Sequence, residues 1–413
     1  MDERLEKVST QNLKLGMYVE RLDRPWTETP FLFQGFYIHD QDDIAELQRH
    51  CAHVYVDRER GIGGDGEEGS SRTITRVNAL KPPPPKPVSR AEERYPREVQ
   101  VEQELGAAKT VHAEATRAVI ELLEKARDER RLDVDLATRT VTPIMASVLR
   151  NPDALVWLTR MKERNAYIYR HSVNASVWGM AFARQLGLDK QAMQEIGLGC
   201  MLFDIGKMQL PAELLERAGP LNPAERTQAR SHVTHSLTML VKSGGVTQRT
   251  LDLVRSHHER FDGSGYPAGL KANEIPTFAK IAGIVDCYDA LTSSRPYAKL
   301  RTPHEALTEI YSWRGKLFQP EVVEQFMQLV GVFPTGSLVE LNTGAVGVVI
   351  AQNETRRLRP RLMLVLDERK KRLHRFEVID LMYDSAWQDV EKFWIERHVQ
   401  PGTHGLDPQE LYL

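Results

Sequence analysis

The stretch HHERFDGSGYP, residues 257–267, concentrates residue types that can do chemistry. Two adjacent histidines, His257 and His258, precede a glycine-rich turn that ends in Tyr-Pro. Each feature alone has an ordinary explanation, since histidines suit a helix C-terminus, where the dipole favours their charge, and glycines suit a turn. The chemistry therefore depends on which other imidazoles and carboxylates the chain can bring to this pair.

Further histidines and aspartates recur in the same part of the chain, within stretches whose apolar spacing predicts helices. They are His171 in YIYRHSVN, Asp204 in LFDIGK, His232 and His235 in SHVTHS, and Asp286 and Asp289 in VDCYDALTSSRP. Inward-facing residues from several helices of a bundle can converge on one point. Imidazoles and carboxylates together suit Zn, Fe, Mn or Ni, whereas Ca and Mg prefer all-oxygen shells. The set as a whole favours a metal site, although His171 alone would be read as a hydrogen-bonded core histidine.

The composition narrows the class of protein. The chain has 413 residues, a net charge of −2 and three cysteines without a CxxC pair. These values fit a globular protein in a reducing compartment and argue against a nucleic-acid partner or a disulfide framework. The N-terminus lacks the apolar core of a signal peptide, and no run of about 18 apolar residues could span a membrane. We therefore expect a cytoplasmic protein.

The residue patterns predict a mainly α protein with small β-containing parts at both ends. Residues 1–58 are expected to form a small α/β domain with strands at 15–23, 35–40 and 53–57 and a helix at 42–50. Residues 59–97, rich in Gly, Ser and Pro, are expected to be a flexible linker because they bury too little apolar surface to offset their ordering entropy. Helical periodicity covers 98–333. Residues 334–413 are expected to form a β-rich appendage and tail, with a helix after 386.

Within 98–333 the apolar spacing predicts a helical bundle. Helices are expected around 98–130 and at 138–150, 153–163, 167–186, 190–203, 223–242, 247–258, 278–291 and 303–313. The first of these helices has heptad-like apolar spacing. It could pair with the same helix of a second chain in a short coiled coil, which would make a homodimer, or it could simply pack on its own domain.

Four stretches in this region resemble the HD-GYP family, a branch of the HD phosphohydrolase superfamily whose best-known activity is hydrolysis of the bacterial messenger cyclic di-GMP. They are YRHSVN, DIGK, HHERFDGSGYP and DCYDALTSSRPYAK, in family order across about residues 150–330. The N-terminal LGMYVERLDRPWTETPFLFQGFYI resembles a domain of unknown function often found in front of HD-GYP domains. The resemblance implies a helical HD-superfamily bundle. It also implies a cyclic di-GMP phosphodiesterase that makes linear pGpG, GMP or both through a metal-activated hydroxide.

The resemblance implies two divalent transition metal ions per chain, of an identity that the residues leave open among Fe, Mn, Zn and Ni. The implied ligands form two sets that share one aspartate: His171, Asp204 and Asp286, and Asp204, His232, His257 and His258. Asp204 would bridge the two ions.

The resemblance also implies roles for residues that touch the substrate. Lys207 would sit beside the scissile phosphate, where its charge would stabilise the transition state. Arg295 and Lys299 would hold substrate phosphates. The signature loop Gly265-Tyr266-Pro267 would reach the substrate through Tyr266, and the family also associates this loop with contacts to diguanylate cyclase domains.

One departure from the family pattern creates a rival hypothesis. The adjacent His-Asp pair that gives HD its name is Phe203-Asp204 in this chain, and phenylalanine cannot bind a metal. The first metal would lose an imidazole, unless a water or His235 replaces it. The alternative function is thus a catalytically weakened module that binds cyclic di-GMP or a diguanylate cyclase. A third hypothesis keeps the hydrolysis and changes the substrate to another nucleotide phosphoester.

Overall fold

The structure is a computed structural model that describes residues 5–23, 36–38, 41–57, 95–160, 167–215, 217, 219–293, 301–353, 358–382 and 393–406. The chain divides into two compact units, Met1–Pro87 and Val88–Leu413, which are described separately below. Most of the expected linker, 59–94, lies outside the described residues. None of the described helices combines the length and the apolarity that a membrane crossing requires.

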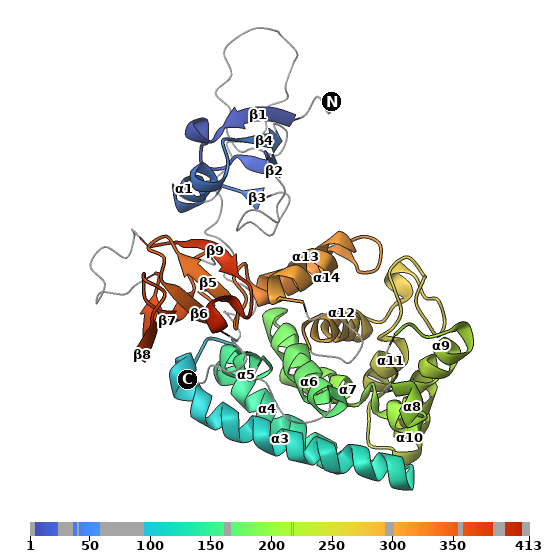
Figure 1. Cartoon of the computed structure of the whole chain (residues 1–413). Coiled ribbons are helices and arrows are strands. Elements are labelled where there is room, and N and C mark those ends of the chain that lie inside the picture. Colours follow the sequence, from blue (N-terminus) through green and yellow to red (C-terminus); the bar gives the residue numbers. More distant parts are fainter. Residues whose placement is uncertain are drawn as a thin grey trace, which may run out of the picture. The chain divides into compact units, whose positions relative to one another are not determined.

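The first unit is a small antiparallel sheet with a helix (Figure 1). The sheet has the order β1-β4-β2-β3, and the elements are β1 (Leu5–Ser9), β2 (Tyr18–Leu22), β3 (Phe36–Tyr37), α1 (Gln41–His50) and β4 (His53–Asp57). Alternating side chains of the strands and one face of α1 form its core, which includes Val19, Leu47 and Val54. The three expected strands and the helix are present. Strand β1 was not predicted.

The second unit is dominated by helices, which confirms the mainly α class. They are α3 (Val101–Glu129), α4 (Val134–Arg150), α5 (Pro152–Leu158), α6 (Tyr167–Gln185), α7 (Lys190–Leu202), α8 (Ala212–Leu215), α9 (Pro223–Arg230), α10 (His232–Ser243), α11 (Gln248–Ser256), α12 (Thr277–Thr292), α13 (Pro303–Ser312) and α14 (Pro320–Val330). The helix expected over 223–242 is in fact two, because the chain breaks at Ser231. Helix α14 was not predicted.

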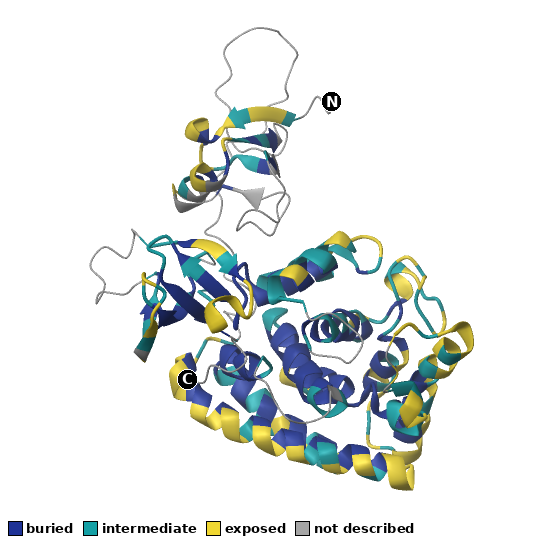
Figure 2. Ribbon diagram, viewed as in Figure 1, coloured by how far each residue is buried: buried dark blue, intermediate teal, exposed yellow. Residues whose placement is uncertain are grey.

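Helix α6 lies at the centre of the bundle and is buried over most of its length (Figure 2). Small and apolar residues surround its axis, as expected for a helix that is covered on all sides. It packs closely on α7, where the Ser176 hydroxyl donates a hydrogen bond to the Gly197 carbonyl at 2.9 Å. Helix α3 buries one face against α4, α5 and α6 and leaves its other face exposed. Its apolar stripe is thus covered within the chain.

Local side-chain signals set the helix ends that matter for the site. Asp189 caps α7 by accepting a hydrogen bond from the Ala192 amide at 2.7 Å. Asn222 and Glu225 form a reciprocal capping box at the start of α9, with Pro223 in its first turn. Each of these helices ends shortly before a candidate functional residue: α7 ends at Leu202, before Asp204, and α9 ends at Arg230, before His232.

The C-terminal part of the second unit is a five-stranded antiparallel sheet, which confirms a β appendage. Its order is β8-β7-β6-β5-β9, with β5 (Leu338–Leu341), β6 (Val346–Ala351), β7 (Arg361–Leu366), β8 (Arg372–Asp380) and β9 (Ile395–Val399). The helix expected after 386 is wrong for the described part of that stretch, because residues 395–399 form β9. This strand pairs with β5, more than fifty residues away along the chain, in a register that sets Glu340 opposite Arg397.

Several contacts between described residues attach this sheet to the helices, and two of them join named side chains across the boundary. Arg361 on β7 makes an ion pair with Glu102 on α3 at 2.7 Å. The ring of His398 on β9 lies 4.3 Å from the ring of His304 on α13.

Candidate metal centre

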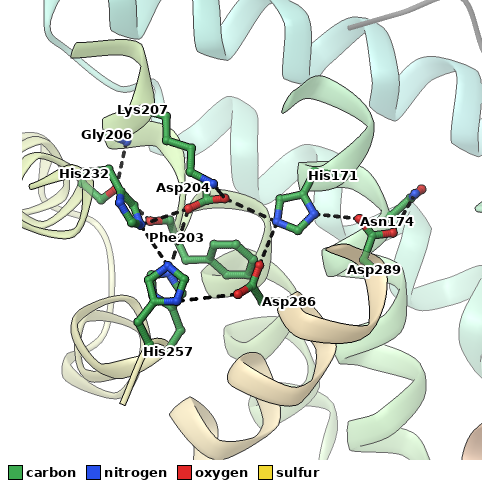
Figure 3. A network of polar contacts seen from close by, with 12 residues as sticks. His171, Asn174, Phe203, Asp204, Gly206, Lys207, His232, His257, Asp286 and Asp289 are labelled. Atoms are coloured by element: carbon green, nitrogen blue, oxygen red, sulfur yellow. Dashed lines mark hydrogen bonds and ion pairs between the residues drawn. The ribbon is translucent and has the colours of Figure 1, made fainter. Parts of the chain in front are cut away.

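Separate helix ends and faces bring imidazoles and carboxylates to one buried point of the second unit (Figure 3). The residues are His171 on α6, Asp204 just after α7, His232 at the start of α10, His257 and His258 at the end of α11, and Asp286 on α12. All six are buried except His258, which is partly exposed. The structure thus brings together every expected metal ligand.

The first group of candidate ligands lies between α6, α7 and α12. Nε2 of His171 lies 3.3 Å from Oδ2 of Asp204 and 3.2 Å from Oδ1 of Asp286. The three ligand atoms lie within 4.8 Å of one another, a spacing that one ion could hold.

The second group uses the other oxygen of the same aspartate. Oδ1 of Asp204 lies 3.2 Å from Nε2 of His232 and 3.9 Å from Nε2 of His257. Nε2 of His258 lies 3.2 Å from Nε2 of His232 and completes this group. Asp204 therefore presents one oxygen to each group, an arrangement in which one carboxylate can bind two ions.

Hydrogen bonds behind the imidazoles determine which ring nitrogens face the centre. Nδ1 of His232 and Nδ1 of His257 lie 2.7 and 2.8 Å from backbone carbonyls of their preceding turns. Carbonyls only accept, so each Nδ1 carries the proton and each Nε2 turns a lone pair inward. Nδ1 of His171 similarly contacts the carboxylate of Asp289 at 2.7 Å. Such outer partners are typical of metal-binding histidines.

Nε2 of His257 and Oδ1 of Asp204 are buried at the centre and have no hydrogen-bond partner among the described residues. A buried acceptor without a donor is costly, and two lone pairs that face each other at 3.9 Å repel. A cation between them would satisfy both. The residues present therefore fit a divalent metal.

The protonation of the site agrees with this donor set. Burial lowers the pKa of His257 to about 4. Burial, together with the charge of His257, holds the pKa of His258 well below its ordinary value. Burial opposes the charge of Asp204, but the charge of the Lys207 ammonium and the contact with His171 outweigh it and hold the pKa of Asp204 well below its usual range. At neutral pH His257 and His258 are therefore neutral imidazoles beside an ionised carboxylate, the form that binds metal.

The first group favours positive charge. Burial opposes protonation of His171, yet its contacts with Asp204, Asp286 and Asp289 raise the pKa of the imidazole well above its ordinary value. The pKa of Asp286 is lowered despite burial, mainly by hydrogen bonding with His171. A point between three carboxylates that attracts a proton this strongly will also attract a cation.

Phe203 occupies the place between the two groups where the family has histidine. Its ring is fully buried, stacks on the His257 ring at 4.6 Å, and meets the His171 ring edge-on at 5.5 Å (Figure 3). The first group therefore offers three ligands and the second offers four.

The turn that carries Asp204 is held against α10 by small residues. Ser236 accepts a hydrogen bond from the Gly206 amide and donates one to the Phe203 carbonyl, both at 2.8 Å. A Cβ on Gly206 would lie 2.0 Å from the His232 carbonyl oxygen, so no other residue fits. One turn further in η3 (Ile205–Gln209), the Lys207 ammonium makes an ion pair with Asp204. Its side chain is one-quarter exposed, so it lies on the open side of the centre.

The signature loop is tied to the same histidines. Glu259 is buried and accepts hydrogen bonds from the amides of Ala268 and Leu270 at 2.7 and 3.0 Å, which fixes the far side of the loop. Gly265 passes so close to the Glu259 backbone that a Cβ would come within 2.4 Å of it. Tyr266 stacks on the His258 ring at 4.6 Å. The expected substrate residue Tyr266 thus lies at the edge of the centre.

Some residues expected at the site are not among the ligand groups. Asp289, for which the sequence indicated no definite role, lies directly behind one of the ligands. Arg295 and Lys299 lie outside the described residues. His235 belongs to neither ligand group of the described residues. Asp289 does not face the ligand groups but orients His171 from behind, and it also accepts a hydrogen bond from Asn174 at 3.0 Å. Its signal in the sequence is its spacing, one helical turn after Asp286 on α12.

Comparison with known proteins agrees with this geometry. Residues 153–322 match the family described as HD domain, residues 5–137 match a domain of unknown function, and residues 338–388 match a KOW domain associated with HD domain. A cyclic di-GMP phosphodiesterase of Pseudomonas aeruginosa is 34% identical over 379 residues, which cover 91% of this chain and 89% of the relative. The chain belongs to the HD-GYP family of HD-domain proteins. Members of the HD-domain family are metal-dependent, in line with the buried cluster found here.

Other relatives match a smaller part of this HD-GYP protein. A cyclic di-GMP phosphodiesterase of Thermotoga maritima is 37% identical over 167 residues, or 40% of this chain and 45% of the relative. The 3'3'-cGAMP-specific phosphodiesterase 2 of Vibrio cholerae is 29% identical over 170 residues, or 41% of this chain and 32% of the relative. The names of these relatives cover two different cyclic dinucleotides.

Proposed function

We propose that this protein is a metal-dependent phosphodiesterase that hydrolyses cyclic di-GMP to linear pGpG, GMP or both. The proposal is supported by the Pseudomonas relative, which matches nearly the whole chain and bears this activity in its name. It is also supported by two groups of buried ligand atoms that share Asp204. That shared carboxylate carries the proposal, because a two-metal site needs a bridge.

We assign the ligands as the geometry groups them. His171, Asp204 and Asp286 would hold one divalent transition metal ion, and Asp204, His232, His257 and His258 would hold a second. When bound, such ions supply positive charge that polarises a phosphodiester and makes a water molecule more acidic. The protein holds the imidazoles in the required tautomer through the hydrogen bonds behind them.

Lys207 is the proposed residue for the scissile phosphate. Its ammonium lies beside Asp204 on the open side of the centre and is partly exposed, so it can reach an anionic substrate without leaving the carboxylate. A fixed positive charge at this point stabilises the negative charge that grows on the phosphoryl oxygens as the ester bond breaks. Arg295, Lys299 and Tyr266 remain proposed substrate-binding residues.

The test is turnover by the full chain, purified without chelator and supplied with Mn or Fe. We expect cyclic di-GMP to be converted to pGpG or GMP, identified by chromatography. Asp204→Ala should abolish turnover because it removes the shared ligand. The proposal fails if metal-replete wild-type protein leaves cyclic di-GMP intact, or if Asp204→Ala retains activity.

One observation favours a second function. Phe203 removes an imidazole from the first ligand group and fills its place with a buried ring. A centre weakened in this way could bind cyclic di-GMP, or a diguanylate cyclase through the Gly265-Tyr266-Pro267 loop, without turnover. Tight cyclic di-GMP binding by metal-replete protein that gives no product would favour this function over hydrolysis.

The remaining assignments stay predictions. They are a regulatory or targeting role for 1–58, a linker at 59–97, a hydrolase domain at 98–333, an appendage at 334–413, a cytoplasmic location and a homodimer. The Vibrio cholerae relatives that act on 3'3'-cGAMP make that dinucleotide a natural competitor substrate in the same assay.

A further inference from the structure

A column of stacked groups leads from the interior of the metal centre to the protein surface. It begins at Phe203, on which His257 stacks at 4.6 Å, and the His257 and His258 rings lie 4.1 Å apart. Tyr266 stacks on His258 at 4.6 Å, and the guanidinium of Arg230 lies over the outer face of this pair, 4.6 Å from the Tyr266 ring centre.

Exposure rises steadily along the column. Phe203 and His257 are fully buried, the His258 side chain is 14% exposed, Tyr266 is half-buried and Arg230 is exposed. Lys207, whose ammonium makes an ion pair with Oδ2 of Asp204, is also partly exposed. Among the described residues, Lys207 beside Asp204 and Arg230 over Tyr266 are thus two exposed or partly exposed cations next to the cluster.

Arg230 is the last residue of α9, where a positive charge also suits the helix dipole. That role alone does not require the guanidinium to lie over a tyrosine ring. A phenol is neutral at ordinary pH, so the contact of Arg230 with Tyr266 is a cation–π interaction that leaves the charge of the guanidinium without a counter-charge. Among the described residues, no ion pair or hydrogen bond of the Arg230 guanidinium is found. Its in-plane N–H groups are available to an anion.

We propose that Arg230 binds the second phosphate of the cyclic dinucleotide, the one that is not cut. The inference rests on the proposed function, because a cyclic dinucleotide carries two phosphodiester groups and only one can lie on the ligand groups beside Lys207. Stacking on Tyr266 fixes the guanidinium plane, so its N–H edge is preorganised for the two oxygens of a phosphate. Arg230 is then a residue that selects dinucleotides over simple phosphodiesters.

The experiment compares Arg230→Met with Arg226→Met on two substrates. Arg226 lies one helical turn earlier on α9, is exposed, and contacts only the Leu221 carbonyl among the described residues, which makes it a matched control. The substrates are cyclic di-GMP, with two phosphates, and bis(p-nitrophenyl) phosphate, with one. Metal content and the circular dichroism spectrum are measured for each variant.

We expect Arg230→Met to raise KM for cyclic di-GMP by about 10- to 100-fold, with kcat changed less than about threefold. The kinetics on bis(p-nitrophenyl) phosphate and the metal content should stay at wild-type values. Arg230→Lys should recover part of the affinity, because it keeps the charge and loses the planar fork. An unchanged KM for cyclic di-GMP overturns the proposal. So does an equal loss on both substrates or a loss of metal, since Arg230 would then only support Tyr266 and His258.

The outcome also separates this inference from the proposed function. If wild-type protein cleaves bis(p-nitrophenyl) phosphate but not cyclic di-GMP, the proposed function is wrong while Arg230 can still be tested by calorimetric binding of cyclic di-GMP. Binding weakened at least tenfold in Arg230→Met would support its role. Equal affinities of the two proteins would overturn it.

Discussion

Replacing Phe203 with histidine should have opposite effects on the metal-free and the metal-bound protein. Phe203 is fully buried between His171 and His257, so the substitution removes about 1.5–3 kcal/mol of side-chain burial. It also places imidazole nitrogens where no donor awaits them, at a further cost of about 1–3 kcal/mol. In the presence of EDTA we therefore expect the free energy of unfolding to fall by about 3–5 kcal/mol.

When metal is present, the new imidazole can become a fourth ligand of the group formed by His171, Asp204 and Asp286. We expect the affinity of that group to rise at least about tenfold, because losses of even outer partners cost 10- to 100-fold. An ion supplied at 100 times its dissociation constant stabilises the fold by about 2.7 kcal/mol. The metal-dependent rise in Tm should therefore be larger in Phe203→His than in the wild type.

The assay is differential scanning fluorimetry with EDTA or Mn, together with metal analysis of the purified proteins. Phe203→Leu is the control, since it loses the ring without gaining a ligand and should fall in stability without gaining metal. The contrary result is that Phe203→His holds no more metal than the wild type and shows the same Mn-dependent shift in Tm. A side chain at position 203 would then not reach the metal ligands, and Phe203 would not explain why the first group has fewer ligands than the second.

Three further predictions follow from the geometry. Asp289→Asn should lower metal affinity about 10- to 100-fold because His171 loses its charged partner, and equal metal titrations would contradict this. Gly206→Ala should destabilise the protein by at least about 2 kcal/mol in urea unfolding, since the new Cβ meets backbone; wild-type stability would refute the close packing. Burial, and then the charge of His304, lowers the pKa of His398 to about 3, so the unfolded chain binds a proton that the folded chain rejects. The contribution of this group to the free energy of unfolding should be complete above pH about 6.5 and should decline as the pH falls towards 4, by at most about 1.4 kcal/mol per pH unit. The variant His398→Phe should make this decline shallower. An unchanged dependence of stability on pH would contradict the prediction.

The sequence predicted the elements whose residues repeat with a clear period. The apolar stripe of α3 and the short strand β4 are examples, and each is buried as its pattern indicates. The strands that were missed, β1 and β9, depend on distant partners. Strand β1 alternates weakly and gains its pairing from β4 some fifty residues away, while β9 depends on β5. The pattern of residues within a short segment does not indicate which distant strand it will pair with.

The candidate metal ligands could be predicted from the sequence. The residues that position these ligands were harder to predict. His171 and His257 stand in motifs whose order along the chain matches a family, and the structure brings them together. Asp289 was counted as one more possible ligand, because its position behind His171 depends on how α12 packs on α6. The stacking of Arg230 on Tyr266 joins two segments that no spacing rule connects.

The central claim is that one buried carboxylate joins two groups of metal ligands. Its most direct test is metal analysis by mass spectrometry of wild-type protein and Asp204→Ala, both purified without chelator and shown to be folded. We predict about two ions per wild-type chain and fewer than about one in the variant, because both groups lose a ligand. An Asp204→Ala protein that keeps the full wild-type metal content, or a metal-replete wild type that holds none, would contradict the claim.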